Sequence, residues 1–262
     1  RMAAQAAKQV IVQKIREAGR EAIFNKFSDY QDEIITAEVD RQDTRFLYVT
    51  LPGSQEAAMA PNDQMPNEHY RMGDRIKVLV NKVENNSKGP QIFVSRTAPD
   101  LVKRLFEQEV PEVYDGTVEI MSISREAGDR SKIAVYTHDT DLDPVGAMVG
   151  QRGARVQAVV NELGGENMDI VEWVEDEAQY IANALNPSEV TDVIFDTENE
   201  RAVTVIVPDN QLSLAIGKKG QNARLAARLT GFKIDIKSES EAANTLSKSD
   251  AVADKAVTEE TN

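Results

Sequence analysis

The strongest constraint on the fold is a pair of glycine motifs at the same place in two repeated segments. Residues 149–153 read Val-Gly-Gln-Arg-Gly, and residues 216–220 read Ile-Gly-Lys-Lys-Gly, 67 residues further on. Gly164 and Gly231 have the same spacing. An isolated G-x-x-G is a weak signal, but two copies at one position of a repeat indicate a repeated structural unit. Both copies predict the order helix, strand, strand, helix, glycine turn, helix and strand.

Each glycine motif predicts a turn with bare backbone between two helices. Glycine permits left-handed dihedrals and lacks the Cβ that would keep a ligand away. The next helix begins at the turn, so its N–H groups and the positive end of its dipole face outward. Such a surface can hold phosphates, as KH modules hold about four nucleotides of single-stranded nucleic acid. A purely structural turn between helices is the alternative interpretation.

Cations at both turns favour phosphate binding over the structural alternative. Gln151 and Arg152 lie between the glycines of the first motif, and Lys218 and Lys219 lie between those of the second. Further cations follow about one turn into each next helix, and they are Arg155 and Arg224. These side chains are the candidates for holding phosphates.

The remaining sequence divides into segments with different patterns. Residues 1–30 contain one long helix, because apolar residues recur there at spacings of three and four. Residues 31–97 contain five short strand patterns separated by turn signals, typical of a barrel of the OB type. The two repeats occupy residues 98–185 and 186–240. Residues 241–262 have no periodicity and are expected to form a disordered acidic tail.

The charge distribution leaves a second function open. The net charge is −14, and residues 98–186 carry 7 basic and 18 acidic side chains. Overall repulsion of nucleic acid follows, so the cations at the turns would have to carry RNA binding locally. The alternative is an acidic protein–protein scaffold that binds a basic partner, with structural glycine turns.

Several chemical functions are disfavoured by composition. The chain has no cysteine and 2 histidines, and it carries no nucleotide-binding or hydrolase motif. We therefore expect no catalytic residue, metal or cofactor. A ribonuclease is disfavoured because the acidic run 172–177 precedes a helix, where Asp176 and its neighbours would cap N–H groups. No apolar run is long enough for a membrane span.

The aromatic residues permit two interpretations. Phe46, Tyr48 and Phe93 lie on barrel strands near cations, where they could stack bases. Alternating strands also bury aromatic side chains, and we expect a core position for each of them. Trp173 is expected to be buried between the two repeats.

Two stretches resemble a known family closely. Residues 143–158 read DPVGAMVGQRGARVQA, and residues 215–226 read AIGKKGQNARLA. With the preceding helix and barrel, they resemble the NusA family of bacterial transcription elongation, termination and antitermination factors. The resemblance covers about residues 1–240 and implies an α+β multidomain fold: an N-terminal helix, a five-stranded OB-type β-barrel of the ribosomal S-one type and two tandem type II KH modules.

The resemblance also implies a site and partners. It implies RNA contacts from Gly150, Gln151, Arg152, Gly153, Arg155, Gly217, Lys218, Lys219, Gly220, Gln221, Asn222 and Arg224. The two KH modules would act as one extended surface for single-stranded nascent RNA in a cytoplasmic, monomeric protein that regulates pausing, termination and antitermination. RNA polymerase and other elongation or antitermination factors are the implied protein partners. The family has a polymerase-binding domain ahead of the barrel, and residues 1–30 correspond to its last helix.

Overall fold

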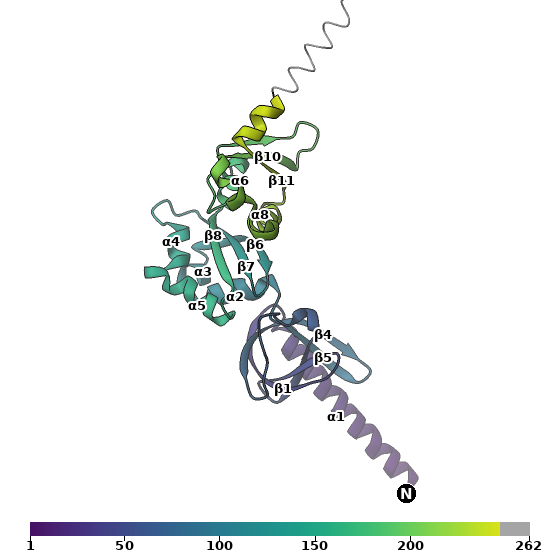
Figure 1. The fold of residues 1–262 in the computed structure, drawn as a ribbon. Helices are drawn as coiled ribbons and strands as arrows, with labels where there is room; N and C mark the ends of the chain where they lie inside the picture. Colours follow the sequence, from purple (N-terminus) through teal and green to yellow (C-terminus); the bar gives the residue numbers. More distant parts are fainter. Residues whose placement is uncertain (247–262) are drawn as a thin grey trace, which may run out of the picture. The chain divides into compact units, whose positions relative to one another are not determined.

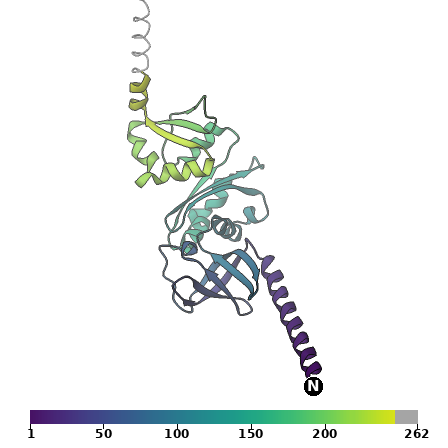
Figure 2. The ribbon, with the colours of Figure 1, turned by 90° about the vertical axis from the view of Figure 1, so that its right-hand side faces the viewer.

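Two compact units make up the chain. The structure is a computed structural model, and it describes residues 1–246. The first unit holds residues 1–109 with residues 158–166, and the second holds residues 110–157 with the chain from residue 167 onward. Figure 1 and Figure 2 show the ribbon from two directions. Among the helices of residues 1–246, none is long and apolar enough to cross a membrane.

The first unit contains a closed five-stranded barrel preceded by a long helix. The barrel order is β1-β2-β3-β5-β4, with β3 and β5 parallel and the other pairs antiparallel. The elements are α1 (Met2–Ser28), β1 (Ile34–Gln42), β2 (Leu47–Leu51), β3 (Gln55–Met59), η1 (Pro61–Asp63), β4 (Arg75–Asn86) and β5 (Gly89–Ser95). The predicted helix and OB-type barrel are therefore confirmed.

Strand alternation forms the barrel core. Leu47, Val49 and Leu51 of β2 are buried while the residues between them are partly exposed, because side chains alternate across a strand. Phe27 is the buried residue of α1 and joins this core. Ile23 is partly buried and packs against the same core, whereas Val10, Ile11 and Ile15, nearer the start of α1, are exposed.

The second unit contains two three-stranded sheets of the same topology. Their orders are β6-β7-β8 and β11-β10-β9. In each sheet the central strand, β7 or β10, pairs antiparallel with the strand before it and parallel with the strand after it. The strands are β6 (Val118–Glu126), β7 (Arg130–Thr137), β8 (Asn167–Glu172), β9 (Asp192–Phe195), β10 (Ala202–Val207) and β11 (Lys233–Ser238). The common topology confirms the internal repeat.

Helices alternate with these strands along the chain in the predicted order. They are α2 (Pro99–Glu109), α3 (Pro111–Tyr114), α4 (Pro144–Val149), α5 (Ala154–Glu162), α6 (Glu177–Ala184), α7 (Leu212–Ile216) and α8 (Gln221–Thr230). The 3-10 turns η2 (Gln151–Gly153), η3 (Asp209–Gln211) and η4 (Lys218–Gly220) complete the elements. The Asp176 carboxylate accepts hydrogen bonds from the backbone N–H groups of Ala178 at 3.0 Å and Gln179 at 3.4 Å. Asp176 is thus the predicted cap of α6.

One hydrophobic core in the second unit draws side chains from both repeats. It includes Ala134 of β7, Ile181 of α6, Val205 of β10 and Leu229 of α8. Trp173 is half-buried rather than enclosed, and its ring centroid lies 5.2 Å from that of Tyr136. The repeats are therefore packed together rather than joined only by the chain.

The predicted disordered tail begins too early. Residues 239–246 are helical, and the remainder of the predicted tail, 247–262, lies outside the described residues. Ser238 Oγ accepts a hydrogen bond from Glu241 N–H at 3.2 Å, and the Glu241 carboxylate accepts one from Ser238 N–H at 3.0 Å. This reciprocal pair is a capping box, which starts a helix in spite of its polar composition.

Candidate nucleic-acid interface

The two glycine turns have the same backbone conformation. Gly150 has φ 76° and ψ 177°, and Gly217 has φ 77° and ψ 171°. Arg152 and Lys219, the third residues of the turns, both have φ 54°, with ψ 27° and 29°. Positive φ is uncommon for residues other than glycine. The same unusual conformation at both turns indicates one structural device used twice.

The first glycine of each turn is required by the side chain beneath it. A Cβ at Gly150 would lie 2.6 Å from Cγ of Arg155, and one at Gly217 would lie 2.8 Å from Cβ and from the backbone nitrogen of Asn222. Arg155 and Asn222 each follow their glycine by five residues. The same close contact between the first glycine and the residue five positions later therefore occurs in both repeats.

The last glycine of each turn has open space above it. A Cβ at Gly153 would meet its nearest neighbour at 4.0 Å, and one at Gly220 would meet its nearest at 3.9 Å. Their φ angles of 76° and 73° still favour glycine. The result is the bare, approachable backbone expected of a phosphate-binding turn, at the positive end of the following helix.

The side chains between the glycines point to solvent. Gln151, Arg152, Lys218 and Lys219 are exposed, and none forms a side-chain hydrogen bond or ion pair within residues 1–246. The first turn also lines an open hollow of about 580 Å³, together with Gly146 of α4 and Ala154 and Arg155 of α5. These cations are therefore available for an anionic ligand.

Arg155 and Asn222 have internal roles rather than exposed positions. Arg155 is half-buried, and its Nη1 donates to Glu112 Oε2 at 2.9 Å and to the carbonyl of Ala147 at 2.8 Å. Asn222 is 6% exposed, and its Nδ2 donates to the carbonyls of Leu185 and Ala215 at 3.0 Å. Both side chains bind carbonyls of the helix that precedes their turn, which positions the turn. Both follow the first glycine of their turn by five residues, although that spacing alone does not predict a supporting role.

Gln221 and Arg224 bind the hairpin between β6 and β7. Gln221 Nε2 donates to Glu126 Oε2 at 2.8 Å and to Asp129 Oδ2 at 2.7 Å. Arg224 Nε donates to Glu126 Oε1 at 2.5 Å, and Arg228 Nη2 donates to the same oxygen at 2.8 Å. The hydrogen bond from Arg224, with those from Gln221 and the positive charges of both arginines, lowers the pKa of Glu126. These predicted RNA-binding residues thus contact the other repeat.

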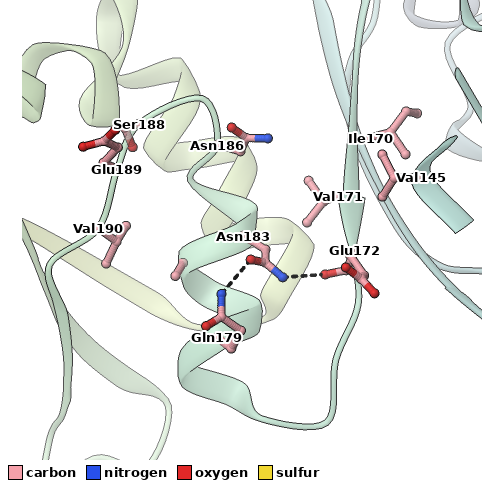
Figure 3. A pocket seen from close by; sticks show the side chains of 11 residues that line it. Val145, Ile170, Val171, Glu172, Gln179, Asn183, Asn186, Ser188, Glu189 and Val190 are labelled. Carbon is pink, nitrogen blue, oxygen red and sulfur yellow. Dashed lines mark hydrogen bonds between the residues drawn. The ribbon is translucent and has the colours of Figure 1, made fainter. Parts of the chain in front are cut away.

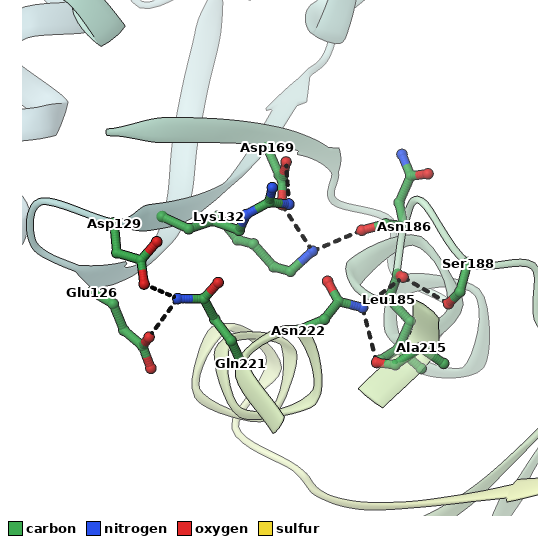
Figure 4. A network of polar contacts seen from close by, with 11 residues as sticks. Glu126, Asp129, Lys132, Asp169, Leu185, Asn186, Ser188, Ala215, Gln221 and Asn222 are labelled. Carbon is green, nitrogen blue, oxygen red and sulfur yellow. Dashed lines mark hydrogen bonds and ion pairs between the residues drawn. The ribbon is translucent and has the colours of Figure 1, made fainter. Parts of the chain in front are cut away.

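A polar network joins the first sheet to the second glycine turn (Figure 4). The side chain of Lys132 on β7 is fully buried, and its Nζ lies 3.3 Å from Asp169 Oδ2 and donates to the carbonyl of Asn186 at 2.8 Å. Burial lowers the pKa of Lys132, while Asp169 opposes that shift. The neighbouring carbonyl, that of Leu185, accepts from Asn222 beneath Gly217. The second turn is therefore fixed relative to the first sheet.

The barrel aromatics lie outside the barrel core, contrary to the expectation of a core position. Phe46, Tyr48 and Phe93 are half-buried, with ring centroids 6.1 Å apart for Phe46 and Tyr48 and 6.3 Å apart for Phe46 and Phe93. They line a pocket of about 430 Å³ that also includes Arg45 and Lys88. Strand alternation places Tyr48 and Phe93 opposite the buried residues of β2 and β5, and Phe46 directly precedes β2. They form an aromatic platform bordered by cations.

The described residues contain no group of three or more histidine, cysteine or carboxylate side chains suited to a metal ion. His69 is exposed, and His138 contacts Tyr136, whose hydroxyl lies 3.2 Å from its Nδ1. The acidic residues around Asp176 cap or flank α6.

The fold and the turns define the class of the protein: a tandem KH-domain protein with an OB-type barrel. A model of the NusA-like first KH domain matches residues 96–173, and a model of the NusA-like second KH domain matches residues 177–244. The matched ranges place α6 in the second domain, whereas the predicted boundary between the repeats lies after residue 185.

Named relatives agree with these matches. The Bacillus subtilis (strain 168) "Transcription termination/antitermination protein NusA" is 62% identical over 242 residues, covering 92% of this chain and 65% of that protein. The protein of the same name from Halalkalibacterium halodurans is 61% identical, covering 92% and 63%. The one from Mycobacterium bovis is 44% identical, covering 91% and 71%. The chain belongs to the NusA family, and it spans 65% and 63% of the length of the first two relatives.

Proposed function

We propose that this chain binds single-stranded RNA through its two glycine turns, as the RNA-binding part of a transcription factor that regulates pausing, termination and antitermination. The observation that carries the proposal is the pair of turns with one shared conformation and exposed, unpaired cations at Arg152, Lys218 and Lys219. Family membership supports it, because the relatives are named transcription termination/antitermination proteins.

The RNA contacts divide into two kinds under this proposal. Residues 150–153 and 217–220 contact phosphates through backbone N–H groups and exposed side chains. Arg155 and Asn222 keep the turns in shape from beneath, and Gln221 and Arg224 hold the two repeats together. The two turns then present one continuous surface to one strand of RNA.

Charge reversal at the turns tests the proposal. Replacing Gln151 and Arg152, and Lys218 and Lys219, by Asp-Asp pairs should abolish binding of short single-stranded RNA in a fluorescence anisotropy titration. Acidic residues are tolerated at a helix N-terminus but repel phosphate. Reversing Lys233 and Lys237 on β11 changes the net charge as much as reversing Lys218 and Lys219 alone, so it is the charge-matched control for that pair. Unreduced binding by the turn variant, with an unchanged circular dichroism spectrum, would contradict the proposal.

The aromatic platform supports a second contact with the same RNA. Phe46 and Phe93 present ring surface beside cations, and the Arg41 guanidinium lies over the Tyr48 ring at 4.1 Å from its centroid. Aromatic rings beside cations are the combination on which single-stranded bases stack in OB folds. Replacing Phe93 by alanine should weaken binding of a long RNA and leave a short one unaffected, as measured by anisotropy. Equal loss for both lengths would contradict a separate contact.

The mode of action follows from this assignment. The chain acts as a monomer without catalysis, cofactor or metal, and it works in the cytoplasm on nascent RNA. Its protein partners are RNA polymerase, bound through the polymerase-binding domain that the family resemblance implies ahead of the barrel, and other elongation or antitermination factors. An acidic scaffold with structural turns is the alternative, and retained RNA binding after charge reversal would favour it.

A further inference from the structure

Strand β9 forms an open edge of the second sheet. The sheet order is β11-β10-β9, and no strand within residues 1–246 pairs with the outer side of β9. The chain enters β9 from α6 through residues 186–190 (Figure 3), where Glu189 N–H donates to Gln211 Oε1 of η3 at 3.2 Å. At the other edge of the sheet, β11 contacts α7, the helix that leads into the second glycine turn. The edge at β9 therefore has an anchored start and is not the edge beside that turn.

The backbone of β9 presents unused hydrogen-bonding groups at this edge. Antiparallel strands bond through every second residue, and Asp196 N–H donates to the carbonyl of Ala202 at the start of β10 at 3.0 Å. The N–H and C=O groups of Val193 and Phe195 therefore face away from β10. In agreement, Val193 N–H donates to the carboxylate of Asp192 at 2.8 Å rather than to β10. Phe195 keeps both of its backbone groups available to a further strand.

Apolar side chains lie beside these backbone groups. Ile194 is 51% exposed and Phe195 is 38% exposed, and they lie on opposite faces of the strand. The Phe195 ring packs edge-on against the ring of Phe232, with centroids 6.0 Å apart. An added strand would cover apolar surface on both faces while it bonds to the backbone, which is how sheet edges bind extended peptides.

The charge around β9 determines the kind of segment that fits. Residues 189–200 carry five acidic side chains and no basic one. They are Glu189, Asp192, Asp196, Glu198 and Glu200. This charge repels nucleic acid, and it also repels a second copy of β9, because like charges at a sheet edge oppose the pairing of identical strands. A segment in which lysine or arginine alternates with apolar residues complements both the charge and the apolar surface.

We propose that the open edge of β9 binds an extended, basic segment of a partner protein as an additional strand of the second sheet. Phe195 supplies the backbone N–H and C=O groups, and the side chains of Ile194 and Phe195 supply the apolar contacts. The acidic side chains of residues 189–200 attract the cations of the partner. This site is distinct from the glycine turns, so binding of the segment requires no RNA.

A labelled peptide measures binding at this edge. The probe is a fluorescein-labelled heptapeptide in which lysine alternates with valine, titrated by fluorescence anisotropy at about 0.15 M salt. The unaltered chain should bind it at least about tenfold more tightly than the same peptide with glutamate in place of lysine. Phe195→Pro removes the outward N–H but keeps the bonds to β10, whereas Phe195→Ala keeps that N–H. Phe195→Pro should bind the lysine peptide about tenfold more weakly than Phe195→Ala, the effect of one or two backbone hydrogen bonds.

Matched charge variants provide a second measurement that leaves the strand itself unaltered. Glu198→Lys/Glu200→Lys should weaken binding of the lysine peptide about tenfold. Glu17→Lys/Glu21→Lys on α1 changes the net charge equally and should weaken it less than about twofold, because salt screens distant charges.

Three results would overturn the inference. They are the absence of measurable binding of the lysine peptide, equal weakening by the two charge variants, and equal affinities of Phe195→Pro and Phe195→Ala with unchanged circular dichroism spectra. Self-association in sedimentation velocity that Phe195→Pro abolishes would assign the edge to a second copy of this chain and would also overturn it. Each of these results leaves RNA binding at the glycine turns unaffected.

Discussion

Gly217→Ala should disrupt the second glycine turn far more than an alanine at another left-handed glycine. Gly217 has φ 77° and ψ 171°, a combination essentially confined to glycine, which costs alanine about 1–3 kcal/mol. The added Cβ would also lie 2.8 Å from Cβ and from the backbone nitrogen of Asn222. Overpacking against backbone costs about 1–3 kcal/mol. The two effects together predict a loss of about 2–6 kcal/mol in the free energy of unfolding.

Gly231→Ala is the matched control for that substitution. Gly231 ends α8 with φ 75° and ψ 15°, and nothing lies within 4 Å of its added Cβ. Its predicted cost is the left-handed conformation alone, about 1–2 kcal/mol. The difference between the two variants therefore measures the close packing at the turn.

Urea unfolding and RNA titration together measure the effect. Gly217→Ala should lower the unfolding midpoint more than Gly231→Ala, and it should weaken binding of single-stranded RNA at concentrations of urea where both variants are folded. Gly231→Ala should bind RNA like the unaltered chain. Equal destabilisation by both substitutions, or unimpaired RNA binding by Gly217→Ala, would refute the assignment of Asn222 and Gly217 as the support of the turn.

The remaining predictions concern ionisation, a buried cation and the form of the RNA. The pKa of Glu126 is lower in the folded chain than in the unfolded chain, so its ionised carboxylate stabilises the fold. This contribution is complete above the unfolded-state pKa of about 4.3, and it is lost as the pH falls through the folded-state pKa. The stability of Glu126→Gln in acid unfolding should therefore depend less on pH below about pH 4 than that of the unaltered chain. Arg96 is 2% exposed, binds both carboxylate oxygens of Glu68 and donates to the Lys77 carbonyl. Arg96→Ala should therefore lower the free energy of unfolding by about 3–5 kcal/mol in urea unfolding. The control is Arg75→Ala at an exposed position, which should lower it by about 0.5 kcal/mol or less. In a gel-shift assay, single-stranded RNA should bind and a perfect duplex of the same sequence should not, because A-form grooves hide the bases. A flexible Gly-Ser insertion after Asn186 should weaken an RNA of about ten nucleotides and leave one of about four unaffected, and equal effects would show that the repeats bind independently.

The sequence predicts the turns well because local rules determine them. Glycine spacing, helix periodicity and the cations of residues 150–153 and 217–220 are all readable over a few residues, and the barrel strands follow from alternation. The helix at 239–246 was equally readable, since Ser238 and Glu241 have capping-box spacing. Low hydrophobicity argued for disorder there, but local hydrogen bonds prevailed.

The roles of the flanking polar residues could not be predicted in the same way. Asn222 and Arg224 lie two residues apart at the start of α8, yet one is buried beneath Gly217 and the other binds Glu126, 98 residues away. Which side of a helix faces the other repeat depends on tertiary packing rather than on spacing from the glycines. The aromatics of the barrel illustrate the same limit, because alternation alone does not identify the buried face of Tyr48.

Amide chemical shifts during an RNA titration test the central claim most directly. With a ¹⁵N-labelled chain and a single-stranded RNA of about ten nucleotides, the largest shift changes should fall on residues 150–153 and 217–220 and should saturate together at one RNA per chain. Smaller changes should follow at Arg155 and Asn222, which support the turns. Changes confined to other surfaces, or independent saturation of the two turns, would contradict RNA binding by a paired glycine-turn surface.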